Sequence, residues 1–154
     1  MSALTERFVA LTGKRTGLPA GQVYPWAMPG ALSGIPSERF WAAVGELVAT
    51  SEVVIDRPKG SRHPRVPEAV YPVDYGYLAG TTGGDGAGID VWVGSIRPAT
   101  VSGVVCTVDS RKRDAEVKIL LGCTHEEEAE IMAFLNKGLM AAVLLSAPAS
   151  PPTP

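Results

Sequence analysis

One stretch in the middle of the chain holds residue types that could bind a hard cation and a phosphate. Tyr71 and Tyr75 precede a glycine-rich loop that carries Asp85, and the loop delivers Asp90 to the start of an apolar strand. Mg²⁺ prefers oxygen ligands and commonly takes one or two carboxylates together with waters and substrate phosphates. Because glycines let several backbone N–H groups turn toward one anion, the loop also suits phosphate. The stretch therefore predicts a metal or phosphate site.

The simpler interpretation of Asp85 is a hairpin turn, which is a common use of aspartate. The residues that follow favour a site instead. In a strand that begins at Ile89, alternation puts Ile89 and Val91 on one face, so Asp90 projects from the other face. A carboxylate that points away from the core filled by its neighbours is available to a ligand, and such context adds weight to a motif.

Cations gather just upstream of this stretch. Residues 55–65 read Ile-Asp-Arg-Pro-Lys-Gly-Ser-Arg-His-Pro-Arg. A guanidinium group binds phosphate in bidentate geometry, so Arg62 or Arg65 could supply a phosphate contact. A solvated loop is the alternative for these cations, and for the segment taken alone it is the better one.

Together these segments resemble the signature of the family I soluble inorganic pyrophosphatases. The family pattern is Ile-Glu-Ile-Pro-Lys-Gly-Ser-Arg, then Tyr-Pro-x-Asn-Tyr-Gly, then Asp-Gly-Asp-Pro-x-Asp-Val. This chain resembles it from about Val53 to Lys118 and more weakly to Lys137. The resemblance implies hydrolysis of pyrophosphate to phosphate with Mg²⁺ as the cofactor, in which metal ions hold the substrate and activate a water.

The resemblance also implies roles for individual residues. The catalytic groups would be Asp85, Asp90, Tyr75 and Asp56, of which the first two would also bind metal and the last stands where the family has a glutamate. The phosphate contacts would be Arg62, Arg65, Tyr71, Lys118 and Lys137. The last of these is matched only weakly, because Asn136-Lys137 stands in place of a Tyr-Lys pair.

Two departures from the family pattern affect the chemistry. Ala87 stands at the middle aspartate of Asp-Gly-Asp, the residue thought to activate the attacking water. In addition, only Pro64 to Val70 remains of a longer hairpin that carries a phosphate-binding arginine. Loss of a general base costs roughly 10²- to 10⁴-fold in rate, so we expect slow hydrolysis of pyrophosphate or a shifted phosphoanhydride or phosphoester substrate. The alternatives are a catalytically inactive phosphate- or nucleotide-binding module and a purely structural oligomerising domain.

The second acidic segment can be aligned with the family in two ways. Asp109 and Asp114 reproduce the spacing of two family aspartates, but Glu116 then takes the place of a lysine. Counting back from Lys118 makes Glu116 the second carboxylate instead. Strand alternation puts Glu116 and Lys118 on one face, which suits a metal ligand beside a phosphate-binding ammonium. We favour this second alignment and keep Asp109 and Asp114 as possible metal ligands.

The elements that must position these residues are two helices and several short strands. One helix opens at Pro36-Ser37-Glu38 ahead of apolar residues spaced by three and four, and another runs from about Thr124 to Asn136 behind a capping box. Strands are expected at Val53–Ile55, Ile89–Val93, Val101–Val108 and Val117–Leu121, with a possible fifth at Tyr71–Leu78. This pattern favours an α+β fold. The resemblance implies a small five-stranded β-barrel similar to the oligonucleotide-binding fold, with flanking helices.

Length and composition limit the remaining possibilities. The 154 residues fit a single domain at 1–146, with an irregular N-terminal section at 1–35 and a disordered Pro-rich tail at 147–154. A net charge of −2 argues against nucleic acid as a partner, and the longest aliphatic run is too short to cross a membrane. Without a signal-like N-terminus or a membrane-length apolar run, we expect a cytoplasmic protein. Because only 19% of the residues are charged, we also expect a homo-oligomer, in which part of the surface is buried against another copy. Cys106, Cys123 and His125 could supply three zinc ligands, but without paired Cys motifs we interpret both cysteines as buried strand residues.

Overall fold

A computed structural model describes residues 38–148, which lie within one compact unit. The predicted section at 1–35 and most of the predicted tail lie outside the described residues. In chain order the elements are α2 (Glu38–Ala49), β1 (Val53–Arg57), β2 (Arg62–His63), β3 (Val66–Val70), β4 (Asp74–Leu78), β5 (Ile89–Val93), β6 (Val101–Asp109), β7 (Asp114–Leu121), α3 (His125–Leu135) and β8 (Met140–Ser146).

Six of the strands form one sheet in the order β1-β4-β5-β7-β6-β8, and β2 pairs with β3 in a separate two-stranded sheet. All pairs are antiparallel except β5 with β7, which are parallel neighbours. The α+β class is therefore confirmed. A barrel requires its two edge strands to pair, whereas within the described residues β1 pairs only with β4 and β8 only with β6. The sheet is thus open where a five-stranded barrel was expected.

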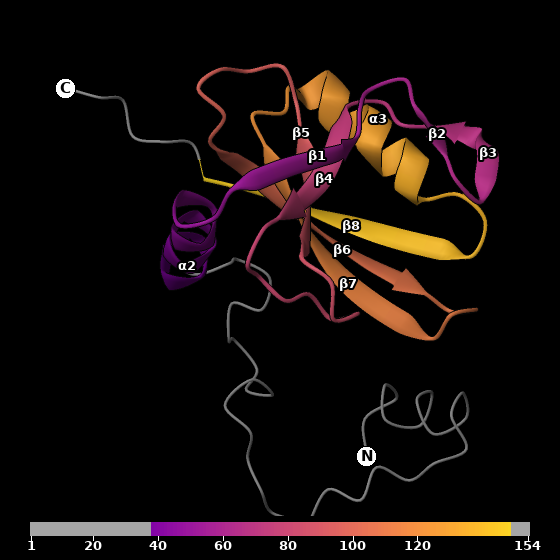
Figure 1. The fold of residues 1–154 in the computed structure, drawn as a ribbon, viewed down its shortest axis with the longest axis horizontal. Helices are drawn as coiled ribbons and strands as arrows, with labels where there is room; N and C mark the ends of the chain where they lie inside the picture. The colour runs from indigo at the N-terminus through magenta and orange to yellow at the C-terminus, as the bar shows by residue number, and fades with distance from the viewer. Residues whose placement is uncertain (1–37, 149–154) are drawn as a thin grey trace, which may run out of the picture. The chain divides into compact units, whose positions relative to one another are not determined.

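Alternate residues of the central strands fill two cores on opposite faces of the sheet. Val91 and Ile119 belong to the core that contains Val44 of α2, whereas Trp92 and Leu120 belong to the core that contains Ile131 of α3. Figure 1 shows the two helices on opposite sides of the sheet. The predicted alternation in β5 is thus confirmed, but both faces are covered, so Trp92 is itself a core residue with 1% exposure.

Helix α2 packs through a narrower stripe than its sequence suggested. Val44 is buried, and Trp41 and Val48 pack against the same core. Phe40 and Leu47 remain exposed. A stripe at spacings of three and four is wide enough to include residues at its margins, and these two lie at the solvent side of α2.

Helix α3 begins as predicted, at a capping box. Thr124 Oγ1 accepts the N–H of Glu127, and Glu127 Oε2 accepts the N–H of Thr124 at 2.9 Å and that of Ser95 at 3.1 Å. Burial tends to raise the pKa of Glu127, but these backbone donors lower it more, so the pKa lies below its usual value. The same carboxylate therefore caps α3 and ties it to the segment after β5.

Strand β8 was not among the predicted strands. It pairs with β6 from Gly103↔Ser146 to Asp109↔Met140 and forms the edge of the sheet. Burial alternates along its first five residues, but the sequence Met-Ala-Ala-Val-Leu-Leu-Ser is apolar up to its last residue. It therefore lacks the alternation of apolar and polar residues by which a strand with one buried face is predicted. The pairing continues to Ala147, the first residue of the predicted tail, whose N–H donates to the carbonyl oxygen of Ser102.

Gly76 lies where β4 passes closest to β1. A Cβ atom at this position would overlap the carbonyl oxygen of Val54 and lie 2.9 Å from Cα of Ile55. Only glycine allows this approach, which brings the neighbouring Tyr75 into line with β5 through the pair Tyr75↔Trp92.

Candidate functional site

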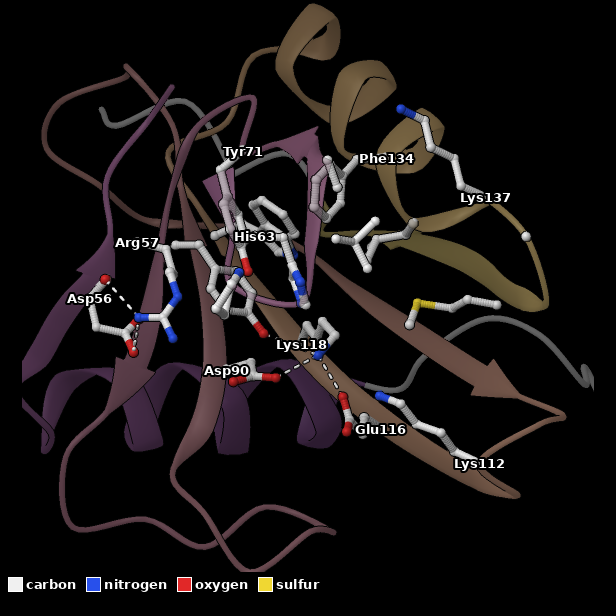
Figure 2. A pocket seen from close by; sticks show the side chains of 18 of the residues that line it. Asp56, Arg57, His63, Tyr71, Asp90, Lys112, Glu116, Lys118, Phe134 and Lys137 are labelled. Carbon is white, nitrogen blue, oxygen red and sulfur yellow. Dashed lines mark hydrogen bonds and ion pairs between the residues drawn. The ribbon is translucent and has the colours of Figure 1, made fainter. Parts of the chain in front are cut away.

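The parallel pairing of β5 with β7 creates a charged group at the centre of the sheet. The register Val91↔Ile119 sets Asp90 beside Lys118. Lys118 Nζ donates to Asp90 Oδ2 at 2.5 Å and to Glu116 Oε2 at 2.6 Å, as Figure 2 shows. The side chain of Lys118 is 5% exposed, while those of Asp90 and Glu116 are 29% and 24% exposed. The ammonium is thus enclosed, and both carboxylates still reach solvent.

Lys118 is buried because it shares a face of β7 with Leu120, a core residue. Burial lowers the pKa of a lysine, but the Asp90 and Glu116 carboxylates outweigh it, so the pKa of Lys118 is raised. The group therefore holds two negative charges around one positive charge, and we call Asp90, Glu116 and Lys118 the charged triad.

Tyr75 is the neutral member of this neighbourhood. Lys118 Nζ lies 3.3 Å from Tyr75 Oη and 5.7 Å from the centroid of its ring. Burial and then the Asp90 carboxylate raise the pKa of Tyr75 well above its usual range, so the phenol keeps its proton. The ring of Tyr75 packs edge-on against Trp92, with 4.6 Å between ring centroids, and the centroid of the Tyr71 ring lies 5.3 Å from that of Tyr75. Aromatic packing therefore fixes the hydroxyl beside the triad.

Asp85 is used first by its own loop. Asp85 Oδ1 accepts the N–H of Ala87 at 2.9 Å, and the N–H of Gly83 donates to the carbonyl of Ala87. Gly86 has a φ of +85°, which favours glycine. Asp85 thus makes the turn that was its simpler interpretation, and it also lines the cavity described next.

A cavity of about 690 Å³ opens beside the triad. It brings together eight of the residues predicted as site residues: Asp56, Tyr71, Tyr75, Asp85, Asp90, Glu116, Lys118 and Lys137. Arg65 and Asp109 line a neighbouring cavity of about 620 Å³ instead. Arg62 and Asp114 line neither cavity.

The residues outside the main cavity have structural partners. Arg62 Nη1 donates to the carbonyl of Pro67 within the β2–β3 hairpin. Asp109 Oδ1 accepts the N–H groups of Arg111 and Lys112, and these backbone bonds lower its pKa. Asp114 is exposed opposite Asp109 in the β6–β7 register. In this structure the segment therefore contributes Glu116 and Lys118 to the main cavity.

Several lining residues were not predicted. Arg57 holds Asp56 through an ion pair of 3.3 Å, and His63, Lys112, Trp92 and Phe134 also line the cavity. Burial and then the charge of Arg57 lower the pKa of His63, so its imidazole is neutral near pH 7. Trp92 could have been predicted, because it lies two residues after Asp90 in the same strand and so shares its face. Phe134 could not, because it reaches the cavity only through the packing of α3 on the sheet.

The donor set fits one Mg²⁺ ion better than a preformed metal cage. Among residues 38–148, no three His, Cys, Asp or Glu side chains gather as a metal-binding group. Asp90 and Glu116 do lie together, and one or two carboxylates with waters and substrate phosphates are the usual shell of Mg²⁺. Both carboxylates already accept from Lys118, so a bound cation would share them with the ammonium.

An α+β fold with carboxylates and an ammonium at one cavity suits a protein that handles phosphorylated ligands. A sequence model described as Inorganic Pyrophosphatase matches residues 48–137, more than half of the chain. The chain therefore belongs to the inorganic pyrophosphatase family. No helix in the described part of the chain is long and apolar enough to span a bilayer.

Solved structures that resemble this one include inorganic pyrophosphatases from two bacteria. The protein from Neisseria gonorrhoeae is 21% identical, with a TM-score of 0.48 over 58% of this chain and 77% of that chain. The protein from Helicobacter pylori is 17% identical, with a TM-score of 0.44 over 61% of this chain and 81% of that chain. No curated protein matches.

Proposed function

We propose that this pyrophosphatase-like protein binds pyrophosphate or a related phosphorylated small molecule in the main cavity and, with Mg²⁺, hydrolyses it slowly. The observation that carries the proposal is the charged triad, which places a protonated lysine and two solvent-reachable carboxylates at one cavity in a chain of this family. The predicted cytoplasmic location and self-association stay predictions.

The positively charged residues and Tyr75 would contact the phosphate, and the carboxylates would bind Mg²⁺. Lys118 already donates to Asp90, Glu116 and Tyr75. An ammonium has three donors, so it would give up its longest bond, the one to Tyr75 Oη, and donate to a phosphate oxygen in a stronger charge-assisted hydrogen bond. Lys112 and Lys137 at the same cavity add positive charge. Tyr75, kept protonated by its surroundings, would donate its hydroxyl hydrogen to the ligand. Asp90 and Glu116 would hold Mg²⁺, with Asp85 as a further candidate; when bound, the ion neutralises phosphate charge and lowers the pKa of a water.

Slow turnover follows from Ala87. Its methyl group cannot accept a proton, and the nearest carboxylate along the loop, Asp85, already accepts the N–H of Ala87. Missing general bases cost roughly 10²- to 10⁴-fold in rate. That bond is also the specific observation that favours the second candidate function, a binding module without turnover.

Isothermal calorimetry and phosphate release, measured on the same preparations with pyrophosphate and Mg²⁺, test these two functions. Heat of binding with slow phosphate release supports the proposal, and heat without release supports the binding module. Absence of both would overturn the placement of a phosphate site here. Asp90→Asn and Glu116→Gln should weaken Mg²⁺ binding. Asp114→Asn, on the same strand as Glu116 but outside both cavities, is the matched control and should leave it unchanged.

Restoring the missing carboxylate tests the explanation of slow turnover. Ala87→Asp places a carboxylate two residues after Asp85 in an exposed loop. We expect faster phosphate release from pyrophosphate, by up to the roughly 10²-fold or more that a general base supplies. Unchanged release by a variant that still binds Mg²⁺ would contradict the role assigned to this position.

A further inference from the structure

The main cavity is much larger than pyrophosphate requires. Its volume is about 690 Å³. Pockets of roughly 300–1,000 Å³ ordinarily bury most of a drug-sized organic ligand. An inorganic anion bound at the charged triad would leave most of this space to water. The cavity therefore has room for an organic group in addition to a phosphate.

The lining combines charged and apolar side chains. Its charged residues include the triad, Glu68, Lys112 and Lys137, and its apolar residues include Val66, Phe134, Leu135 and Met140. Figure 2 shows Phe134 and Tyr71 on the α3 side of the cavity and Asp90 and Glu116 on the opposite side of the view, with His63 drawn between them. Burial of apolar surface is favourable by about 25 cal/mol per Å². A phosphate group is polar and would not bury these apolar side chains, whereas an organic group would.

The β2–β3 hairpin contributes an apolar side chain, and neither of its two arginines, to the main cavity. Val66 lines the cavity and is 41% exposed. The cations of the hairpin turn elsewhere, because Arg62 donates to Pro67 and Arg65 lies at the neighbouring cavity. Glu68 of β3 also lines the cavity, and its carboxylate would repel a phosphate. This wall is therefore suited to a part of the ligand that carries no negative charge.

Aromatic rings give the lining its chemical character. His63 lies parallel to Tyr71 with 6.2 Å between ring centroids, and the ring centroid of Phe134 lies 5.2 Å from that of Tyr71. Trp92 also lines the cavity, although its Nε1 is enclosed by protein and out of reach of a ligand. Flat rings pack well against flat rings, so this lining suits a ligand with a flat ring.

We propose that the ligand of this cavity is a nucleoside phosphate, with its phosphates at the triad and its base against Val66, His63, Phe134 and Met140. This inference rests on the proposed phosphate site and adds the class of the organic group. A purine or pyrimidine base has a flat, largely apolar face, which matches these rings and apolar side chains.

Calorimetry with ADP and with pyrophosphate, at one Mg²⁺ concentration and on the full chain, tests the proposal. We expect ADP to bind at least about ten-fold more tightly, since cover of apolar surface adds to the phosphate contacts. Equal affinity, or tighter pyrophosphate binding, would overturn the inference and leave the proposed function intact. If neither compound binds, the proposed function fails and the inference fails with it.

A matched pair of valines in β3 locates the base. Val66 and Val70 are 41% and 44% exposed, but only Val66 lines the cavity. Val66→Ser should weaken ADP binding about 3- to 10-fold and leave pyrophosphate binding unchanged, because only the apolar cover is lost. Val70→Ser should change neither. Equal losses of ADP and pyrophosphate in Val66→Ser, or no loss of ADP, would contradict the placement of the base.

Discussion

The two sides of the main cavity are built in different ways. The charged side stands on β5 and β7 in the middle of a six-stranded sheet, where Val91, Trp92, Ile119 and Leu120 are almost fully buried. The opposite side includes β2 and β3, a sheet of only two strands whose side chains are mostly exposed. The first side is fixed by packing on two faces of the sheet. The second is held mainly by its own hydrogen bonds and by the stacking of His63 on Tyr71.

We expect the two sides of the cavity to have different roles in ligand binding. A one-residue slip of β7 against β5 would turn Lys118 to the opposite face and empty two cores, so the triad is fixed as firmly as the core itself. Changes in the hairpin leave those cores untouched. We infer that substitutions in the sheet alter whether a phosphate binds, and that substitutions in the hairpin alter which phosphate compound binds.

The largest loss of stability is expected from Gly76→Ala, which disturbs the backbone of β4 beside the charged side of the cavity. The new Cβ would overlap the Val54 carbonyl, and backbone atoms cannot move aside as a flexible side chain can. We expect a loss of roughly 3 kcal/mol or more in the free energy of unfolding, measured with urea. Gly45→Ala in α2 is the control. It meets nothing within 4 Å and should stabilise by about 0.5–1 kcal/mol. A mild effect of Gly76→Ala would contradict the close approach of β1 and β4.

Lys118→Met removes the cation of the triad and keeps the length of the side chain. Asp90 and Glu116 would then face each other unpaired, and because both still reach solvent we expect a loss of about 1–3 kcal/mol in unfolding free energy. Phosphate should bind more weakly and Mg²⁺ more tightly, since the two carboxylates no longer share the ammonium. Unfolding with and without Mg²⁺ measures both effects, and an unchanged response to Mg²⁺ would contradict the shared use of these carboxylates.

Glu127→Gln tests how α3 is attached beside β5. At pH 7 we expect a loss of about 1 kcal/mol, because a charged cap with two backbone donors is replaced by a neutral one. The folded pKa of Glu127 lies below the ordinary 4.5, so its contribution is present above that pH and is lost as the pH falls through the folded value. Urea unfolding from pH 7 to pH 3 should therefore show the two proteins converge in stability at acid pH. A constant difference would mean that the charge of Glu127 does not matter.

The smallest effect is expected in the hairpin. Val66→Ser and Val70→Ser should each change the unfolding free energy by no more than about 0.5 kcal/mol, as at other exposed positions. Thermal unfolding checks this directly. A larger loss in either variant would show that the hairpin is part of the core, and the contrast between the two sides of the cavity would fail.

The elements with one strong local signal were predictable from the sequence. The capping box fixed the start of α3, and alternating apolar residues gave β5 its bounds and the face of Asp90. Strand β8 could not be predicted in the same way, because it lies at an edge and its neighbour β6 supplies the pairing. The same holds for the open sheet, which depends on which strands meet at the edges.

The candidate site shows the same limit at the level of residues. The preference for Glu116 with Lys118 followed from alternation along a single strand, but their meeting with Asp90 depends on the parallel register of β5 and β7, which no local pattern encodes. Arg62 was predicted as a phosphate ligand by residue type, and it stays a prediction. What the sequence does not indicate is that its Nη1 donates to the Pro67 carbonyl of its own hairpin, a contact that depends on how tightly the chain turns there.

The parallel pairing of β5 and β7 has a consequence for how the protein comes into being. Asp90 and Lys118 are 28 positions apart, and β6 pairs along the other edge of β7. Contacts between distant positions form late, since the intervening loop must first lose its freedom. A growing chain that has not yet released β7 from the ribosome has no triad. Binding of a phosphate compound would therefore report that β5 and β7 have paired.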